Sequence, residues 1–142
     1  MILEIHHPRH VPPPRWSDLP GAPVTGTVLC ALTDLQDGDI RCLNLPDRPA
    51  NNTDEMYRIL IMRTGDQVQA YVNRCAHFGV PLSQSRDKLI FTPHQTLSCN
   101  VHYAKYRWID GLCISGDCEG ESLIPVPVQV NSAGLIEIGT AP

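Results

Sequence analysis

Proline and glycine interrupt this chain so often that long helices have no room to form. The sequence holds 13 Pro and 10 Gly among 142 residues. Proline breaks helices, and glycine favours turns. The segments between these breaks are short, and they are either apolar or alternate with a period of two, as strands do. We therefore expect an all-β fold, with no internal repeat and no convincing amphipathic helix.

The strands predicted from these segments fold back on one another as antiparallel hairpins. The clearest turn is Asp110-Gly111, because this dipeptide suits the tight turn of a two-stranded hairpin, and a further turn is expected at Arg63–Asp66. The predicted strands cover Val24–Leu32, Arg41–Leu45, Met56–Met62, Val68–Val72, Leu89–Thr92, Thr96–Ser98, Tyr106–Ile109, Leu112–Ile114, Ile124–Val130 and Leu135–Ile138.

Length and composition fit one domain behind a proline-rich arm. Residues 1–23 include Pro8, Pro12, Pro13, Pro14, Pro20 and Pro23, so we expect an extended N-terminal arm there. Residues 24–142 form the single expected domain. With 42% hydrophobic and 18% charged residues, this chain has the balance of a protein that buries a core.

The net charge and the lack of a long apolar run argue against a nucleic-acid partner and a membrane location. The formal net charge is -4, so the basic surface that a nucleic acid requires is not expected. The sequence has no run of 18 apolar residues and does not begin like a signal peptide, which favours a cytoplasmic protein away from the membrane. Because that compartment is reducing, the 6 cysteines point to metal ligation rather than to a disulfide framework.

Two short clusters combine a thiol with an imidazole. Cys75-Ala76-His77 and Cys99-Asn100-Val101-His102 each come directly after a predicted strand. Two loops of one sheet can aim such side chains at one point, and two sulfurs with two nitrogens suit a zinc ion or an iron–sulfur cluster. His94 lies in the predicted turn between two strands, where an exposed histidine is expected rather than a ligand.

The residues around these clusters resemble a known family. The stretch from Asn73 to Ser83, with Gly79, Pro81 and Leu82, followed by Cys99–His102, is similar to the paired loops of Rieske-type ferredoxins. The resemblance extends more weakly from Val24 to Ile138. It implies stacked antiparallel sheets, with a small cluster-binding subdomain at about residues 73–121 formed by the two loops.

The same resemblance implies a 2Fe-2S cluster and its ligands. Cys75 and Cys99 would bind one iron, and His77 and His102 the other. Tyr106 falls where family members often have an aromatic residue, so its hydroxyl either reaches a ligating sulfur or is the wet tip of a core side chain.

The function implied by the resemblance is one-electron transfer from a reductase to a terminal oxygenase or other oxidoreductase. Such a carrier is not an enzyme by itself and needs no small-molecule substrate. The small subunit of an assimilatory nitrite reductase-like complex is an alternative. A zinc-stabilised binding module on the same four ligands is a further one, although zinc fingers usually pair Cys with Cys and His with His.

Several residues depart from the family pattern. Tyr103 stands where a glycine is common, which leaves the backbone of the second loop and the direction of the ring open. The extra loop cysteines and the serine of respiratory members are replaced here by Val80, Val101 and Ala104. Fewer hydrogen bonds to the cluster predict a reduction potential at the low end of the Rieske range.

The remaining cysteines and a short acidic stretch have no assigned role. Cys30 and Cys42 are expected to be small buried hydrophobic residues. Cys113 and Cys118 occupy a segment that lies near the cluster in the family, and two free thiols are favoured there over a disulfide. The acidic residues Asp117, Glu119 and Glu121 form either a solvated loop or a docking face for a basic reductase.

Overall fold

The computed structural model describes residues 14–45, 57–76, 82, 89–99, 103–116 and 118–140. In these residues the regular structure is almost entirely strand, which confirms the all-β prediction. Neither short 3-10 helix of this part, η2 (Trp16–Asp18) or η3 (Leu32–Asp34), is long and apolar enough to cross a membrane. The strands are β1 (Val28–Ala31), β2 (Ile40–Leu45), β3 (Tyr57–Thr64), β4 (Gln67–Val72), β5 (Ile90–Thr92), β6 (Thr96–Ser98), β7 (Lys105–Arg107), β8 (Cys113–Ser115), β9 (Pro125–Val126), β10 (Val128–Val130) and β11 (Leu135–Ile138).

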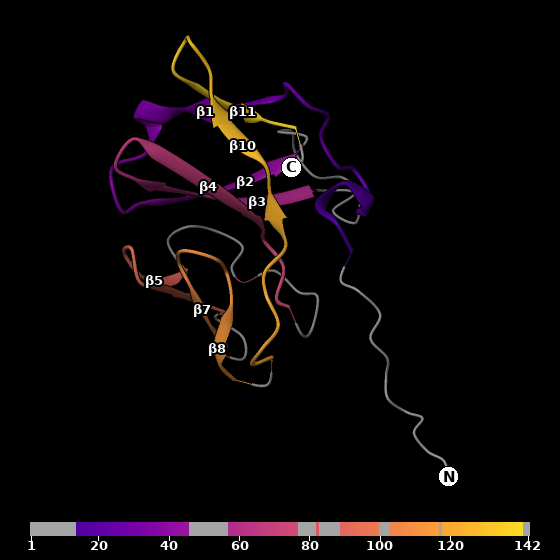
Figure 1. Ribbon diagram of the computed structural model, residues 1–142, viewed down its shortest axis with the longest axis vertical. Helices are drawn as coiled ribbons and strands as arrows, with labels where there is room; N and C mark the ends of the chain where they lie inside the picture. The colour runs from indigo at the N-terminus through magenta and orange to yellow at the C-terminus, as the bar shows by residue number, and fades with distance from the viewer. Residues whose placement is uncertain are drawn as a thin grey trace.

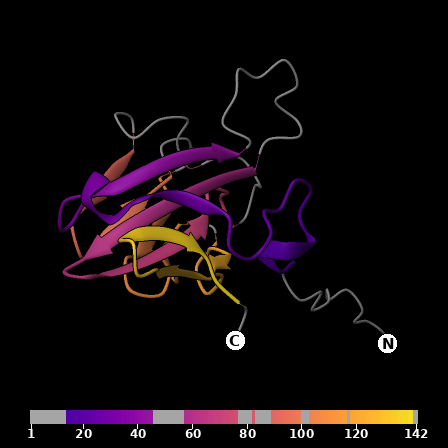
Figure 2. The same cartoon turned by 90° about the horizontal axis from the view of Figure 1, so that it is seen from above.

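The strands form three antiparallel sheets. The terminal sheet has the order β1-β11-β10, the central sheet β2-β3-β4-β9, and the hairpin sheet β5-β6-β7-β8. Figure 1 shows the hairpin sheet, in orange, at the lower end of the molecule and the other strands above it. Figure 2 shows the strands of the terminal sheet, in indigo and yellow, lying against the magenta strands of the central sheet. Stacked antiparallel sheets are therefore confirmed.

The central sheet is buried on both faces, and this explains the continuous apolar run of its middle strand. In β3, Ile59 and Ile61 pack in the core shared with the terminal sheet, while Leu60 and Met62 pack in the core shared with the hairpin sheet. Successive side chains of a strand point to opposite faces, so a strand between two cores has no polar face. The second core also contains Cys75, Leu82, Leu97, Cys99, Tyr106, Trp108, Cys113, Cys118 and Leu123.

The predicted strand over Ile124–Val130 is wrong as one element. β9 pairs with β4 in the central sheet, whereas β10 pairs with β11 in the terminal sheet. Pro127 separates them, and because proline has no N–H it cannot continue a hydrogen-bonded ladder. The chain therefore crosses from one sheet to the next at this proline.

Three further predicted strands are shorter in the structure, and one of them loses only Leu89, because β5 begins at Ile90. The first begins at Val28 instead of Val24, because Thr27 donates its backbone N–H back to Val24 and forms a turn there. The strand predicted to reach Ile109 ends at Arg107, because residues 108–110 form the turn that precedes Gly111. The turn at Asp110-Gly111 itself is present as predicted.

The described end of the proline-rich arm packs against the domain. Trp16, Leu19 and Ala22 contact the core between the terminal and central sheets, and the Tyr57 hydroxyl donates to the Trp16 carbonyl at 2.9 Å. Residues 14–23 are thus not extended throughout, because η2 interrupts them. Residues 1–13 lie outside the described residues, and the domain boundary near residue 23 stays a prediction.

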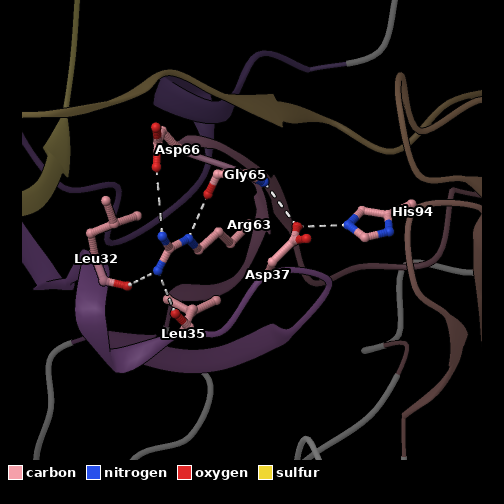
Figure 3. Close-up of polar contacts among 7 residues, drawn as sticks. All are labelled: Leu32, Leu35, Asp37, Arg63, Gly65, Asp66 and His94. Atoms are coloured by element: carbon pink, nitrogen blue, oxygen red, sulfur yellow. Dashed lines mark hydrogen bonds and ion pairs between the residues drawn. The ribbon is translucent and has the colours of Figure 1, made fainter.

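Polar contacts join the central sheet to the hairpin sheet. The Trp108 indole N–H donates to the Thr64 hydroxyl at 2.9 Å, and the His94 ring lies 5.6 Å from the Trp108 ring, centroid to centroid. His94 Nε2 contacts Asp37 Oδ1 at 2.8 Å, and this carboxylate also accepts the Gly65 N–H (Figure 3). These two bonds hold the pKa of Asp37 below its usual value.

The same close-up explains how the β3–β4 hairpin holds the β1–β2 connection. The Arg63 guanidinium donates to the carbonyls of Leu32 and Leu35, at 3.2 and 2.8 Å, and to that of Gly65 (Figure 3). Through its contact with Asp37, His94 links the turn between β5 and β6 to the β1–β2 connection. Its place in that turn matches the expectation that it is a turn residue.

Replacing Gly111 by alanine is expected to destabilise the fold more than replacing Gly134 by alanine. The two glycines have nearly the same φ, +75° and +77°, so both substitutions carry the cost of a left-handed alanine, about 1–2 kcal/mol. A Cβ at Gly111 would lie 2.8 Å from Tyr71 Cε1, whereas a Cβ at Gly134 meets nothing within 4 Å. Chemical denaturation of both variants measures the difference, expected at about 1–3 kcal/mol. Equal midpoints would contradict this packing.

Candidate metal centre

Two buried thiols belong to the core below the central sheet. Cys75 follows β4, Cys99 follows β6, and their exposed fractions are 1% and 0%. Both belong to the core shared by the central and hairpin sheets, although they come from segments far apart in sequence. That the two thiols bind the same metal group stays a prediction.

The two predicted histidine ligands, His77 and His102, lie outside the described residues. Within the described ranges, no group of three or more His, Cys, Asp or Glu side chains is placed so that it could hold a metal ion. The four-residue ligand set predicted from the sequence consequently stays a prediction. The structure describes the positions of its two cysteines only.

The hydroxyl of Tyr106 lies among the groups that surround Cys75. Its oxygen is 3.3 Å from Cys75 Sγ, accepts the backbone N–H of Ala76 at 3.0 Å, and lies 3.3 Å from Cys118 Sγ. Burial raises the pKa of Tyr106 well above its usual range, so the phenol keeps its proton. Of the two readings of Tyr106, the contact with a candidate ligand sulfur is the one that agrees with the structure.

Asn73 fixes the start of the first loop. Its backbone N–H donates to the Arg58 carbonyl and its side-chain oxygen accepts the N–H of Leu82, both at 2.8 Å. Asn73 is 4% exposed and Leu82 is fully buried. The loop is therefore closed by a bond between residues nine positions apart, which gives both residues of the sequence motif a structural role.

Tyr103 keeps the backbone conformation that a glycine would adopt. Its φ is +60°, in the left-handed region that glycine favours. The Tyr103 N–H donates to the Cys99 carbonyl at 2.8 Å, and the Cys99 N–H donates to the Ala104 carbonyl at 2.9 Å. Its side chain is 68% exposed, which answers the question left by the sequence: the ring does not pack inward.

Cys113 and Cys118 are buried beside Tyr106. Each is 1% exposed, their sulfurs are 2.7 Å apart, and both are free thiols, as favoured from the sequence. Burial raises the pKa of Cys118 to about 12. Sequence reasoning missed their contact with Tyr106, although the hairpin register about Asp110-Gly111 pairs Tyr106 with Cys113.

The other cysteines and the acidic stretch are less enclosed. Cys30 and Cys42 lie in β1 and β2 as predicted, but they are half-buried rather than fully buried, at the margins of the two cores. Glu119 and Glu121 are exposed, and Asp117 lies outside the described residues. The described carboxylates are therefore accessible to a partner.

The chemistry of this region fits an iron–sulfur cluster. Two buried thiols are soft ligands of the kind that iron–sulfur clusters require. A phenol that keeps its proton next to one of them can donate a hydrogen bond to that sulfur. A structural zinc site would use the same ligand types, so the metal is identified by measuring iron and zinc in the protein.

Comparison with known proteins agrees with this assignment. The sequence model of the Rieske [2Fe-2S] domain family matches residues 25–131. The ferredoxin of carbazole 1,9a-dioxygenase from Nocardioides aromaticivorans IC177 is similar in structure, with a TM-score of 0.61 at 18% identity over 83% of this chain and 100% of that chain. A chain from the complex of reduced oxygenase and oxidized ferredoxin in carbazole 1,9a-dioxygenase gives a TM-score of 0.59 at 23% identity, over 81% and 94%.

A curated relative carries the same domain within a longer protein. The terminal oxygenase component of carbazole 1,9a-dioxygenase from a Sphingomonas species is 43% identical over 54 residues. That match spans 38% of this chain and 14% of the relative, so it concerns only a small part of the oxygenase. The family model, by contrast, covers most of the present sequence, and this chain therefore belongs to the Rieske 2Fe-2S domain family.

Proposed function

We propose that this protein is a one-electron carrier, a Rieske-type ferredoxin that takes electrons from a reductase and delivers them to a terminal oxygenase. The observation that carries the proposal is the phenol of Tyr106 against Cys75 Sγ, in a chain of the Rieske 2Fe-2S domain family. The fold match along the whole length of a ferredoxin supports a carrier. Neither this match nor the oxygenase relative favours the nitrite reductase alternative.

Four side chains would hold the cluster. Cys75 and Cys99 would bind one iron, and His77 and His102 the other. When bound, a 2Fe-2S cluster supplies a one-electron couple, and neutral imidazoles in place of two thiolates raise its potential above that of all-cysteine clusters. The protein's own part is to bury the two thiols under the central sheet and to keep a proton on Tyr106 beside Cys75.

The partner surface is proposed at the second loop. Tyr103 follows this loop and is exposed, and Glu119 and Glu121 are exposed on the segment after β8. A basic patch on a reductase would complement these carboxylates and speed association at low salt. A ferredoxin–oxygenase pair also agrees with one of the similar structures, the complex of reduced oxygenase and oxidized ferredoxin in carbazole 1,9a-dioxygenase. A cytoplasmic location stays a prediction.

The test is an electron paramagnetic resonance spectrum of the dithionite-reduced protein, with iron and zinc measured on the same sample. We expect a rhombic signal whose average g value lies below that of all-cysteine clusters, together with two irons per chain. One zinc per chain and no signal would overturn the proposal in favour of a structural metal module. Reoxidation of the reduced protein by a terminal oxygenase then tests the partner.

A further inference from the structure

A pair of thiols lies directly behind the tyrosine that contacts the candidate cluster ligand. Cys113 Sγ and Cys118 Sγ are 2.7 Å apart, and both side chains are almost completely buried. The backbone around them is fixed, because the Cys113 N–H donates to the Glu121 carbonyl at 2.7 Å and the Cys113 carbonyl accepts the Gly120 N–H at 3.2 Å. A bond between the two sulfurs would therefore need little movement of the chain.

The two thiols are connected to Cys75 through one hydroxyl. The one S–H of Cys118 has two acceptors within reach, the Tyr106 oxygen at 3.3 Å and Cys113 Sγ at 2.7 Å, and the Cys113 S–H donates to the Ser115 carbonyl at 3.3 Å. With the Ala76 N–H also donating to this oxygen, the Tyr106 proton is left to point toward Cys75 Sγ. Donors to a hydroxyl oxygen polarise its O–H and strengthen the bond that it donates.

We propose that Cys113 and Cys118 are a dithiol–disulfide pair, and that its oxidation by a peroxide weakens the hydrogen bond from Tyr106 to Cys75. In the oxidation, two S–H bonds and the O–O bond of hydrogen peroxide break, one S–S bond forms, and two water molecules leave. Two electrons pass from the sulfurs to the peroxide, with the two thiol protons. The oxidant must be small, because neither sulfur is accessible to a bulky reagent.

The consequence is a change in the reduction potential of the cluster. Once Cys118 has lost its S–H, it can no longer donate to Tyr106, and the phenol becomes a weaker donor to Cys75. A hydrogen bond to a ligand sulfur stabilises the reduced, more negative cluster, so weakening it lowers the potential. This second half of the proposal rests on the proposed function, whereas the formation of the disulfide does not.

The first test counts thiols in the holoprotein. Protein treated with dithiothreitol and desalted is exposed to a small excess of hydrogen peroxide, denatured with N-ethylmaleimide and digested with trypsin. The last basic residue of the sequence is Arg107, so Cys113 and Cys118 are together on the C-terminal peptide, with no other cysteine. We expect this peptide to escape alkylation and to be lighter by two hydrogen atoms. Double alkylation, or a sulfinic acid on one sulfur, overturns the proposal.

The second test is a redox titration followed by electron paramagnetic resonance. We expect the equilibrium constant for reduction of the cluster by the same mediator to be about threefold smaller in peroxide-treated protein than in dithiol protein. This corresponds to a reduction potential lower by about 30 mV, at 59 mV per tenfold change. The Cys118→Ala variant lacks the donor and should show the lower potential before and after peroxide. The Cys118→Ser variant keeps an O–H donor and should retain the higher potential under both conditions.

The controls separate this proposal from the proposed function. The Cys30→Ser variant leaves the pair intact and should behave like the unchanged protein in both tests. Equal potentials in the dithiol and disulfide forms overturn the link to Tyr106. A protein with no cluster signal before treatment contradicts the proposed function, while the thiol count on the C-terminal peptide still decides whether the pair forms a disulfide.

Discussion

Replacing Cys75 by serine is expected to remove the cluster, so that iron falls from two per chain to nearly none and the signal of the reduced protein is lost. A serine hydroxyl is a harder ligand with a much higher pKa than a thiol, so it binds iron of an iron–sulfur cluster poorly. Cys75 is also 1% exposed, and solvent cannot supply a substitute ligand. The measurement is iron content together with electron paramagnetic resonance of the purified variant.

The matched control for this loss is Cys30→Ser, the same chemical change in β1. Cys30 is half-buried and packs at the core on the other side of the central sheet, so iron should stay at two per chain. Cys99→Ser should reproduce the loss, because Cys99 is the other buried thiol of the proposed set. Circular dichroism separates loss of the cluster from loss of the fold. Full iron content in both Cys75→Ser and Cys99→Ser would contradict the ligand assignment.

Local pattern was sufficient to predict most strands. The β3–β4 hairpin could be read from an apolar run, a glycine-containing turn and an alternating segment, since each feature depends on neighbouring residues only. The crossing at Pro127 was missed because alternation from Ile124 to Val130 looks the same whether one sheet or two receive the side chains. Periodicity reports which residues share a face, and it does not report which sheet the face meets.

In the candidate site, too, features set by neighbouring residues could be predicted, and features set by tertiary packing could not. The buried loop positions of Cys75 and Cys99 could be predicted because each lies in a short motif that follows a strand, while their role as ligands stays a prediction. The contact of Cys118 with Tyr106 depends on how the segment after β8 turns back under the hairpin sheet, which is a tertiary feature. The exposed ring of Tyr103 was likewise open in the sequence, because a left-handed backbone fixes the loop but not the direction of its side chain.

Replacing Tyr106 by phenylalanine is expected to lower the reduction potential of the cluster. The hydroxyl lies 3.3 Å from Cys75 Sγ and keeps its proton, so it stabilises the extra negative charge of the reduced form. A hydrogen bond to a charged group contributes about 1.5–3 kcal/mol, and part of it is present in both redox states. A difference of about 1.4 kcal/mol between the states corresponds to about 60 mV for one electron.

The measurement is a redox titration of Tyr106→Phe beside Tyr71→Phe. Tyr71 is also buried, but its hydroxyl lies 3.3 Å from the Trp108 carbonyl. Both variants lose a buried hydroxyl and some stability, while only Tyr106→Phe should change the potential. Removing the Tyr106 hydroxyl also removes the acceptor of the Ala76 N–H, so a small loss of stability accompanies the shift. Equal potentials in the two variants would mean that the Tyr106 proton is not directed at the ligand sulfur.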